Sequence, residues 1–134
     1  MSKNTASEPI VFITTMKIHE GKLDLVKEAA KKSLAFSEKN GPQLMAGVYI
    51  DEENMVANGL QVHRDSESIL SFWQIADPYI RDVMQYVATT RVDIYGQPNE
   101  AVMASMRKLA GESVTLTVKP RLAGFVHFNS QSKN

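Results

Sequence analysis

The sequence predicts a small α+β domain in which an antiparallel sheet carries helices on one face. Segments typical of strands alternate along the chain with segments of helical spacing. Two of the strand segments flank the short acidic connection Asp51-Glu52-Glu53-Asn54, a pattern typical of a hairpin. The 134 residues are enough for one hydrophobic core and too few for two. We therefore expect one domain over residues 10–128, between polar, flexible tails at 1–9 and 129–134.

The first half of the chain indicates a strand, a helix and a hairpin. Residues 10–18 are rich in β-branched residues and apolar on both parities, which predicts a strand covered on both sides. Residues 22–39 switch to helical spacing, with lysines opposite the apolar face. Asn40-Gly41-Pro42 is expected to end this helix by a left-handed cap and a proline that cannot continue it. Residues 44–50 and 55–64 then form the two hairpin strands.

The middle of the chain indicates a capped helix with a break. Asp65 or Ser66 can accept hydrogen bonds from the free amides of the first turn. Asp77-Pro78 is expected to interrupt the helix, because proline lacks the amide donor and clashes with the preceding turn. The helical pattern resumes over residues 79–89. The apolar residues of the first helical segment are Ile69, Phe72, Trp73 and Ala76.

The last third of the chain indicates a further helix and strand. Residues 91–95 are typical of a short strand or an extended link. Pro98-Asn99-Glu100 opens a helix that Gly111 ends. Residues 113–119 alternate in polarity, which predicts a half-buried strand. A terminal apolar run over residues 124–128 is expected to be a strand as well.

The order β-α-β-β-α-(α)-β matches the ferredoxin-like arrangement, a four-stranded antiparallel sheet with its helices on one face. That arrangement leaves the second face of the sheet uncovered. The strand residues on that face are too apolar for water, and a patch of that size is rare on a monomer. We therefore expect two copies to pack sheet against sheet as a symmetric homodimer.

Composition excludes several classes of function. Fifteen basic and fifteen acidic residues cancel, and no basic stripe indicates nucleic-acid binding. The absence of cysteine excludes disulfides, thiolate ligands and a cysteine nucleophile. No apolar run approaches the roughly 20 residues of a membrane span, and the start lacks a signal peptide, so we expect a cytoplasmic protein. The three histidines form no pair at metal-ligand spacing, and the acidic connection lacks the glycine of a calcium loop, so we expect no metal.

Three side chains are candidates for binding or catalysis. Trp73 is the strongest, because its large flat surface can stack on an aromatic molecule; the alternative is that it only fills the core. His63, near the end of the second hairpin strand, is a candidate general base, because imidazole exchanges a proton near neutral pH. The alternative for His63 is an exposed strand end. His127 is a second candidate base, with a dimer interface or a sheet edge as its alternative.

Three segments together resemble a known group of proteins. They are residues 11–18 running into His19-Glu20-Gly21-Lys22, the hairpin with its acidic connection, and Arg64-Asp65-Ser66-Glu67 leading to Phe72-Trp73. In these residues the chain resembles the dimeric α/β-barrel superfamily, and within it the antibiotic-biosynthesis-monooxygenase or quinol-monooxygenase branch. The resemblance covers about residues 9–128. It implies that two subunits pack sheet against sheet, and that each keeps a pocket between its own sheet and helices.

The resemblance also implies site residues. Members that oxygenate without a cofactor use a helix tryptophan and a tyrosine six positions later, and Trp73 and Tyr79 match this spacing. The same members carry an asparagine four positions before the tryptophan, where this chain has Ile69. Haem-degrading members need a histidine ten positions after the tryptophan and an asparagine on the first strand. This chain has Val83 and Thr14 at those positions, which excludes haem degradation.

Two functions follow as hypotheses. The first is a cofactor-independent monooxygenase acting on a phenolic or quinol-type aromatic molecule, without flavin, haem or metal. Trp73 and Tyr79 would orient the ring, His63 or His127 would remove the phenolic proton, and the electron-rich anion would react with dioxygen itself. The alternative is a non-catalytic protein that binds a small aromatic molecule. A third reading is an assembly unit whose pocket is filled by side chains.

Overall fold

The computed structural model describes residues 8–127, which form five strands and three helices. The strands are β1 (Ile10–Ile18), β2 (Met45–Asp51), β3 (Val56–His63), β4 (Val87–Tyr95) and β5 (Thr115–Lys119). The helices are α1 (Leu23–Asn40), α2 (Ser66–Met84) and α3 (Glu100–Ala110). Apart from residues 8 and 9, the tails predicted from the sequence lie outside the described residues.

The strands form one mixed sheet in the order β2-β3-β1-β4-β5. The three pairings among β2, β3, β1 and β4 are antiparallel, as the ferredoxin-like class predicts. β5 adds a fifth strand at the edge and runs parallel to β4. The α+β class is therefore confirmed, but the strand predicted over residues 113–119 is an added edge strand. The fourth place in the antiparallel sheet belongs to β4.

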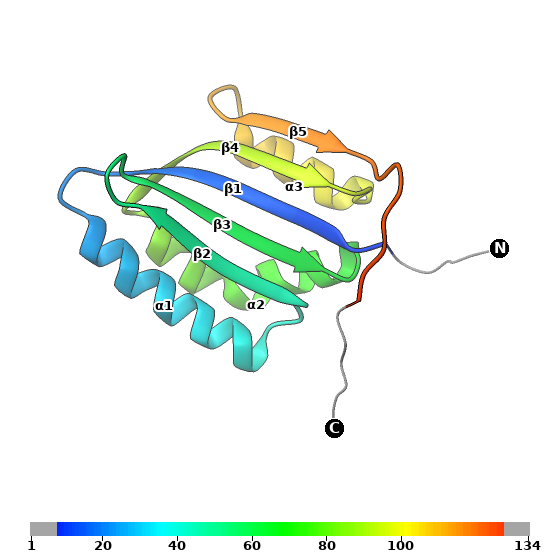
Figure 1. Ribbon diagram of the computed structural model, residues 1–134, viewed down its shortest axis with the longest axis horizontal. Coiled ribbons are helices and arrows are strands. Elements are labelled where there is room, and N and C mark those ends of the chain that lie inside the picture. Colours follow the sequence, from blue (N-terminus) through cyan, green and yellow to red (C-terminus); the bar gives the residue numbers. More distant parts are fainter. Residues whose placement is uncertain (1–7, 128–134) are drawn as a thin grey trace.

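All three helices lie on one face of the sheet, which we call the inner face (Figure 1). The inner face holds two clusters of buried side chains, and β1 contributes to both. Phe12 belongs to one cluster and Met16 to the other, with Thr14 between them on the same strand. The first cluster consists of Ile10, Phe12, Ile69, Val92, Ile94, Val102 and Met106, and the second of Met16, Ile18, Val26, Ala57 and Val87.

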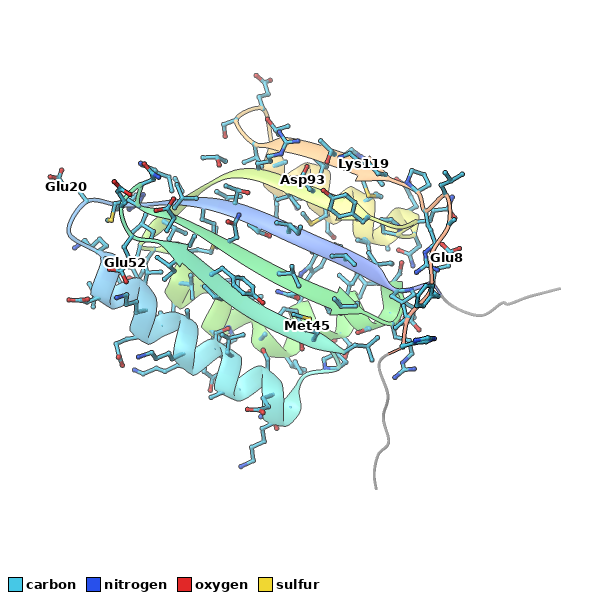
Figure 2. All side chains as sticks on the ribbon, in the orientation of Figure 1. Glu8, Glu20, Met45, Glu52, Asp93 and Lys119 are labelled. Carbon is cyan, nitrogen blue, oxygen red and sulfur yellow. The ribbon has the colours of Figure 1, made fainter. Side chains whose placement is uncertain are left out.

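The opposite, outer face carries no helix within residues 8–127 (Figure 1). The strand register places Ile13 of β1 beside Leu60 of β3 on this face. Met45 and Tyr49 of β2 share the face and are 37% and 53% exposed, and Figure 2 shows Met45 on the strand nearest α1. This half of the outer face is the apolar surface that the sequence predicts.

The other half of the outer face, along β4 and β5, is charged. Asp93 accepts hydrogen bonds from Arg91 (2.8 Å) and from the Thr117 hydroxyl, and lies 3.9 Å from Lys119 Nζ. Figure 2 shows Asp93 and Lys119 on these neighbouring strands. The hydrogen bond from Arg91 is the main reason why the pKa of the Asp93 carboxyl is lowered. This polar half was not predicted from the sequence.

Most of the predicted helix ends are confirmed. Asp65 accepts a hydrogen bond from the Ser68 amide at the start of α2 (2.9 Å), and Asn99 accepts one from the Val102 amide at the start of α3 (3.0 Å). Gly111 ends α3 with a positive φ of 58°. Gly41 ends α1 with φ −86°, an extended conformation, so the left-handed cap predicted there is wrong.

Helix α2 continues through Pro78, where the sequence predicts a break. Proline removes the hydrogen bond that the carbonyl of Gln74 would accept. Both residues are exposed, so water can replace the missing donor. The prediction failed because the proline lies on the solvent side of the helix.

Two further differences concern strands. The helix predicted to reach residue 89 ends at Met84, and residues 87–95 form the full strand β4, where Val87 pairs with Ile18 of β1. The β-branched residues of β4 pack well on the pleated surface of a sheet, and this packing overrides the helical spacing that the sequence shows up to residue 89. The predicted terminal strand is absent from residues 121–127, and Phe128 lies outside the described part of the chain. No helix between residues 8 and 127 is both long and apolar enough to cross a membrane.

Candidate functional site

A cavity of about 320 Å³ lies between the sheet and the helices, beside the middle of β1. Its walls come from the inner faces of β1, β2, β3 and β4, from α1 and α2, and from the end of α3. Most of these side chains are aliphatic or aromatic. Ligand pockets in proteins are mostly apolar and measure about 300–1,000 Å³, so this cavity has the properties of a small binding site.

Trp73 of α2 is part of the cavity wall, on the inner helix face that the sequence predicts. Its ring meets that of Phe12 edge to face, with centroids 6.3 Å apart and planes at 63°. This geometry is favourable for two aromatic rings and holds the indole in one orientation. Phe72 extends the same wall. Because Trp73 is only partly buried, some of its ring surface is free to contact a ligand.

The polar side chains of the wall are neutral. Apart from the indole, they are the hydroxyls and amides of Thr14, Ser33, Ser37, Gln43, Gln61 and Thr89. Among the described residues, no acidic or basic side chain and no tyrosine lines the cavity. A localised charge in such a space would lose its hydration without compensation. The cavity therefore favours a neutral ligand, or one whose charge is delocalised over several atoms.

His63 lies inside the protein, and is not the exposed strand end that the sequence left open. Its side chain is 1% exposed, and its Nε2 lies 2.9 Å from Gln61 Oε1 and its Nδ1 2.8 Å from Ser68 Oγ. Burial lowers the pKa of His63 from 6.5 to about 4, against the opposing effect of Asp65. His63 is therefore neutral near pH 7. It does not line the cavity itself, whereas its partner Gln61 does.

The buried imidazole predicts a loss of stability in mild acid. The pKa of His63 is lower in the folded protein than in the unfolded chain, so the unfolded chain binds the extra proton first as the pH falls. The free energy of unfolding should drop by about 2 kcal/mol between about pH 7 and about pH 5 because of this group alone. Urea unfolding of the wild-type protein and of His63→Gln at both pH values measures the effect. An equal loss in the two proteins would show that His63 is not the cause.

Tyr79 and Ile69 do not take the places that the resemblance implies. Tyr79 stacks on Phe36 of α1, with ring centroids 4.4 Å apart and planes at 22°, and it does not line the cavity. Ile69 is fully buried in the core cluster beneath β1 and β4. Thr14 and Val83 do lie in the cavity wall. Of the aromatic pair inferred from the spacing, the structure brings Trp73 alone to the cavity.

His127 lies on the segment that follows β5. It is exposed, and its ring centroid is 4.7 Å from that of Phe125 on the same segment. It does not line the cavity. The structure therefore does not bring His127 and His63 together.

Sequence reasoning missed the two glutamines of the cavity. Gln61 lies on the inner face of β3, where its register partner on β1 is Phe12. Gln43 precedes β2, and no group among residues 8–127 donates a hydrogen bond to its buried Oε1. The alternation pattern of β3 puts the apolar Val56, Leu60 and Val62 on the opposite parity, which assigns Gln61 to the polar side. A single glutamine also belongs to no motif, so the sequence did not mark either residue.

The acidic connection between β2 and β3 is structural. Asp51 accepts hydrogen bonds from the amide and the side chain of Asn54 (3.1 and 2.8 Å), which close the turn. Glu52 forms an ion pair with Lys27 of α1 at 2.8 Å. Within residues 8–127, no group of three or more histidine, aspartate or glutamate side chains is placed to hold a metal ion.

Comparison with known proteins finds likeness in structure and none in sequence. No model of a protein family matches the chain, and no curated protein matches it. Among solved structures, MupZ from Pseudomonas fluorescens superimposes with a TM-score of 0.69 at 11% identity, over 90% of this chain and 95% of MupZ.

Two further solved structures connect the fold to a described group of proteins. One is a "putative antibiotic biosynthesis monooxygenase" from Nitrosomonas europaea, with a TM-score of 0.60 at 13% identity over 68% of this chain and 91% of that one. The other is SnoaB, a cofactor-independent oxygenase from Streptomyces nogalater, with a TM-score of 0.57 at 7% identity over 69% and 96%. The chain has the fold of the antibiotic-biosynthesis-monooxygenase-like proteins. At these identities the likeness concerns the fold alone.

The shared part of this monooxygenase-like fold is about two-thirds of the chain in the last two comparisons. Helix α3 contributes to the site, because its residues Met106, Leu109 and Ala110 belong to the cavity wall.

Proposed function

We propose that this protein is a cofactor-independent monooxygenase whose substrate is a phenolic or quinol-type aromatic molecule bound in the cavity. The observation that carries the proposal is the cavity itself, an apolar space beside Trp73 and Phe12 with neutral polar groups in its wall. The fold shared with SnoaB supports the reaction type.

An apolar cavity suits a reaction in which the substrate itself reduces dioxygen. The phenolate form of the substrate spreads its charge over the ring, which lowers the cost of burying it. Dioxygen reacts at the ring carbon para to the oxygen. One oxygen atom becomes a new carbonyl there, and the other leaves as water with the hydrogens of that carbon and of the hydroxyl. The substrate supplies all four electrons, so the protein has only to bind and orient the substrate and to exclude water.

The cavity volume bounds the substrate. At about 320 Å³ the space lies at the lower end of ligand pockets. We propose a compact substrate with on the order of two or three fused rings. Its flat face would contact Trp73, whose orientation Phe12 holds.

Oxygen consumption with 1-naphthol tests the proposal. Protein treated with a chelator, without added flavin, should consume oxygen and form 1,4-naphthoquinone in equal amounts. The control is Ala30→Phe, which places a ring in the cavity from the buried face of α1 and should reduce consumption to background. Wild-type consumption no greater than that of Ala30→Phe would contradict the proposal.

The same assay tests the proposed bases. Substitution of His63 or His127 by glutamine should lower turnover if that imidazole takes the phenolic proton, while binding of 1-naphthol persists. His63 does not line the cavity and its contact there is the Gln61 amide, so it would affect a ligand only through that residue. Unchanged turnover in both variants would leave the ionisation to the substrate itself.

One observation favours the second candidate function, a binding protein without chemistry. No titratable side chain among the described residues lines the cavity, so no general base contacts a ligand directly. Under this alternative, 1-naphthol quenches the fluorescence of Trp73 but no oxygen is consumed.

We also propose that two copies pair through the outer face of the sheet. The apolar half of that face, around Ile13, Leu60 and Tyr49, is covered by no helix or strand of the described residues. Burying it in a symmetric dimer would remove this surface from water and leave each cavity on the far side of its own sheet.

A further inference from the structure

The amide of Gln61 is held by His63. Gln61 Oε1 lies 2.9 Å from His63 Nε2, a hydrogen-bond distance. An amide oxygen only accepts, so in this arrangement His63 donates its Nε2–H to Gln61. The other end of the amide, the Nε2 group with two N–H donors, is then the part left for a ligand in the cavity that Gln61 lines.

The protonation state of His63 supports the same arrangement. A neutral imidazole with its proton on Nε2 has an acceptor at Nδ1. The Ser68 hydroxyl lies 2.8 Å from Nδ1 and can donate to it. The backbone of Ser68 is in turn fixed, because its amide donates to Asp65 at the start of α2 (2.9 Å). A line of hydrogen bonds therefore runs from the helix cap through the buried imidazole to the wall of the cavity.

A second polar side chain in the wall, that of Gln43, offers a hydrogen-bond acceptor where Gln61 offers a donor. Gln43 Oε1 is buried and accepts no hydrogen bond within the described residues, an unfavourable state for an amide oxygen. Leu44, the next residue, donates its amide to the Val62 carbonyl at 2.8 Å, which places Gln43 beside the end of β3. Gly41 makes room for the folded side chain, because a Cβ at that position would lie 2.3 Å from Gln43 Oε1.

We infer that the cavity recognises the oxygen groups of its ligand at two points, with Gln61 as donor and Gln43 as acceptor, and that His63 is the positioning residue for Gln61. The ligand class is a hydroxylated aromatic ketone, or the phenol that is its tautomer. Its carbonyl or phenolate oxygen accepts from Gln61 Nε2, and its hydroxyl donates to Gln43 Oε1, which turns from Gly41 toward the cavity when the ligand binds. The inference rests on the proposed function only in taking the cavity as the site of an aromatic ligand.

Matched ligands separate the two contacts from simple apolar binding. Calorimetric titration with 1-tetralone and with tetralin, the hydrocarbon that lacks the carbonyl, measures the contact with Gln61. Gln61→Leu should weaken 1-tetralone about 3- to 10-fold and leave tetralin unchanged. The pair 1-naphthol and 1-methoxynaphthalene, which lacks the hydroxyl proton, measures the contact with Gln43. Gln43→Met should weaken the naphthol by a similar factor and spare the ether.

The positioning role of His63 has its own test. His63→Leu keeps an apolar side chain in the buried site but cannot donate, so it should weaken 1-tetralone about 3-fold and spare tetralin. His63→Gln can again donate to Gln61 and should restore the affinity for the ketone. His19→Gln, an exposed histidine in the turn after β1, is the control and should change neither ligand. If His63→Leu does not fold, the comparison of His63→Gln with wild type and the titrations of Gln61→Leu still test whether the amide of Gln61 binds the carbonyl.

The outcomes distinguish this inference from the proposed function. Equal loss of both ligands of a pair, or no loss of either, would overturn the inference even if oxygen is consumed with 1-naphthol. Selective loss of the oxygen-bearing ligands without any oxygen consumption would support the inference and contradict the oxygenase. If the wild-type protein binds none of the four ligands, both are wrong.

Discussion

Replacing Ile69 by asparagine, the residue that oxygenases of this fold are expected to carry there, should destabilise this protein strongly and add no activity. Ile69 is fully buried among Ile10, Phe12, Ile94 and Val102. The substitution removes apolar contacts and leaves an amide without partners in the core. We expect the free energy of unfolding to fall by about 3–5 kcal/mol.

Urea unfolding at neutral pH measures this loss. The control is Ile75→Asn on the same helix, where the isoleucine is 40% exposed and the amide can reach water, so the change should be small. A loss below about 1 kcal/mol for Ile69→Asn, or oxygen consumption raised above the wild-type level, would show that position 69 reaches the cavity after all.

A polar side chain at position 69 would lie in the core and destabilise the protein. A polar group that contacts a ligand in this cavity therefore has to come from another position. Helix α2 presents Trp73 to the cavity and buries Ile69 in the core. The inner face of β3 instead supplies Gln61, supported by His63 on the same strand. In this chain a glutamine on a strand can therefore make the polar contact with the ligand that the resemblance assigns to an asparagine on the helix.

The sequence predicted those parts of the fold that depend on local patterns. The acidic hairpin, the Asp65 and Asn99 caps and the glycine end of α3 all involve residues close together in the chain. The prediction from sequence was wrong where contacts between residues far apart in the chain decide the structure. Pro78 is tolerated because its side of α2 faces water, and residues 87–90 become a strand because β1 offers them a partner.

The candidate site was predictable only in part. Trp73 could be placed in the wall because helical spacing puts it on the apolar face of α2. Tyr79 lies six residues further on, and the packing of α1 against α2 turns it onto Phe36. The roles of His63 and Gln61 depend on how β3 meets the start of α2, which no spacing in the sequence reveals.

Replacing Ile13 by glutamate should convert the proposed dimer into single subunits. Ile13 lies in the middle of β1, the central strand of the sheet, with Leu60 and Asp93 as its neighbours in the register. Sheet-to-sheet pairing would bury one added carboxylate from each copy next to Asp93, whose own carboxylate already pairs with Arg91. Burial of an unpaired charge costs several kcal/mol, so the dissociation constant should rise on the order of 1,000-fold or more.

Sedimentation velocity over a range of protein concentrations measures this shift directly. Leu25→Glu is the matched control, because Leu25 is 43% exposed on α1, on the helix side of the molecule, and its substitution should leave the association unchanged. The outer face would lose its role if the wild-type protein sediments as a single subunit at every concentration. It would also lose that role if Ile13→Glu remains as dimeric as Leu25→Glu, since two buried carboxylates cannot be accommodated at the centre of such an interface without cost.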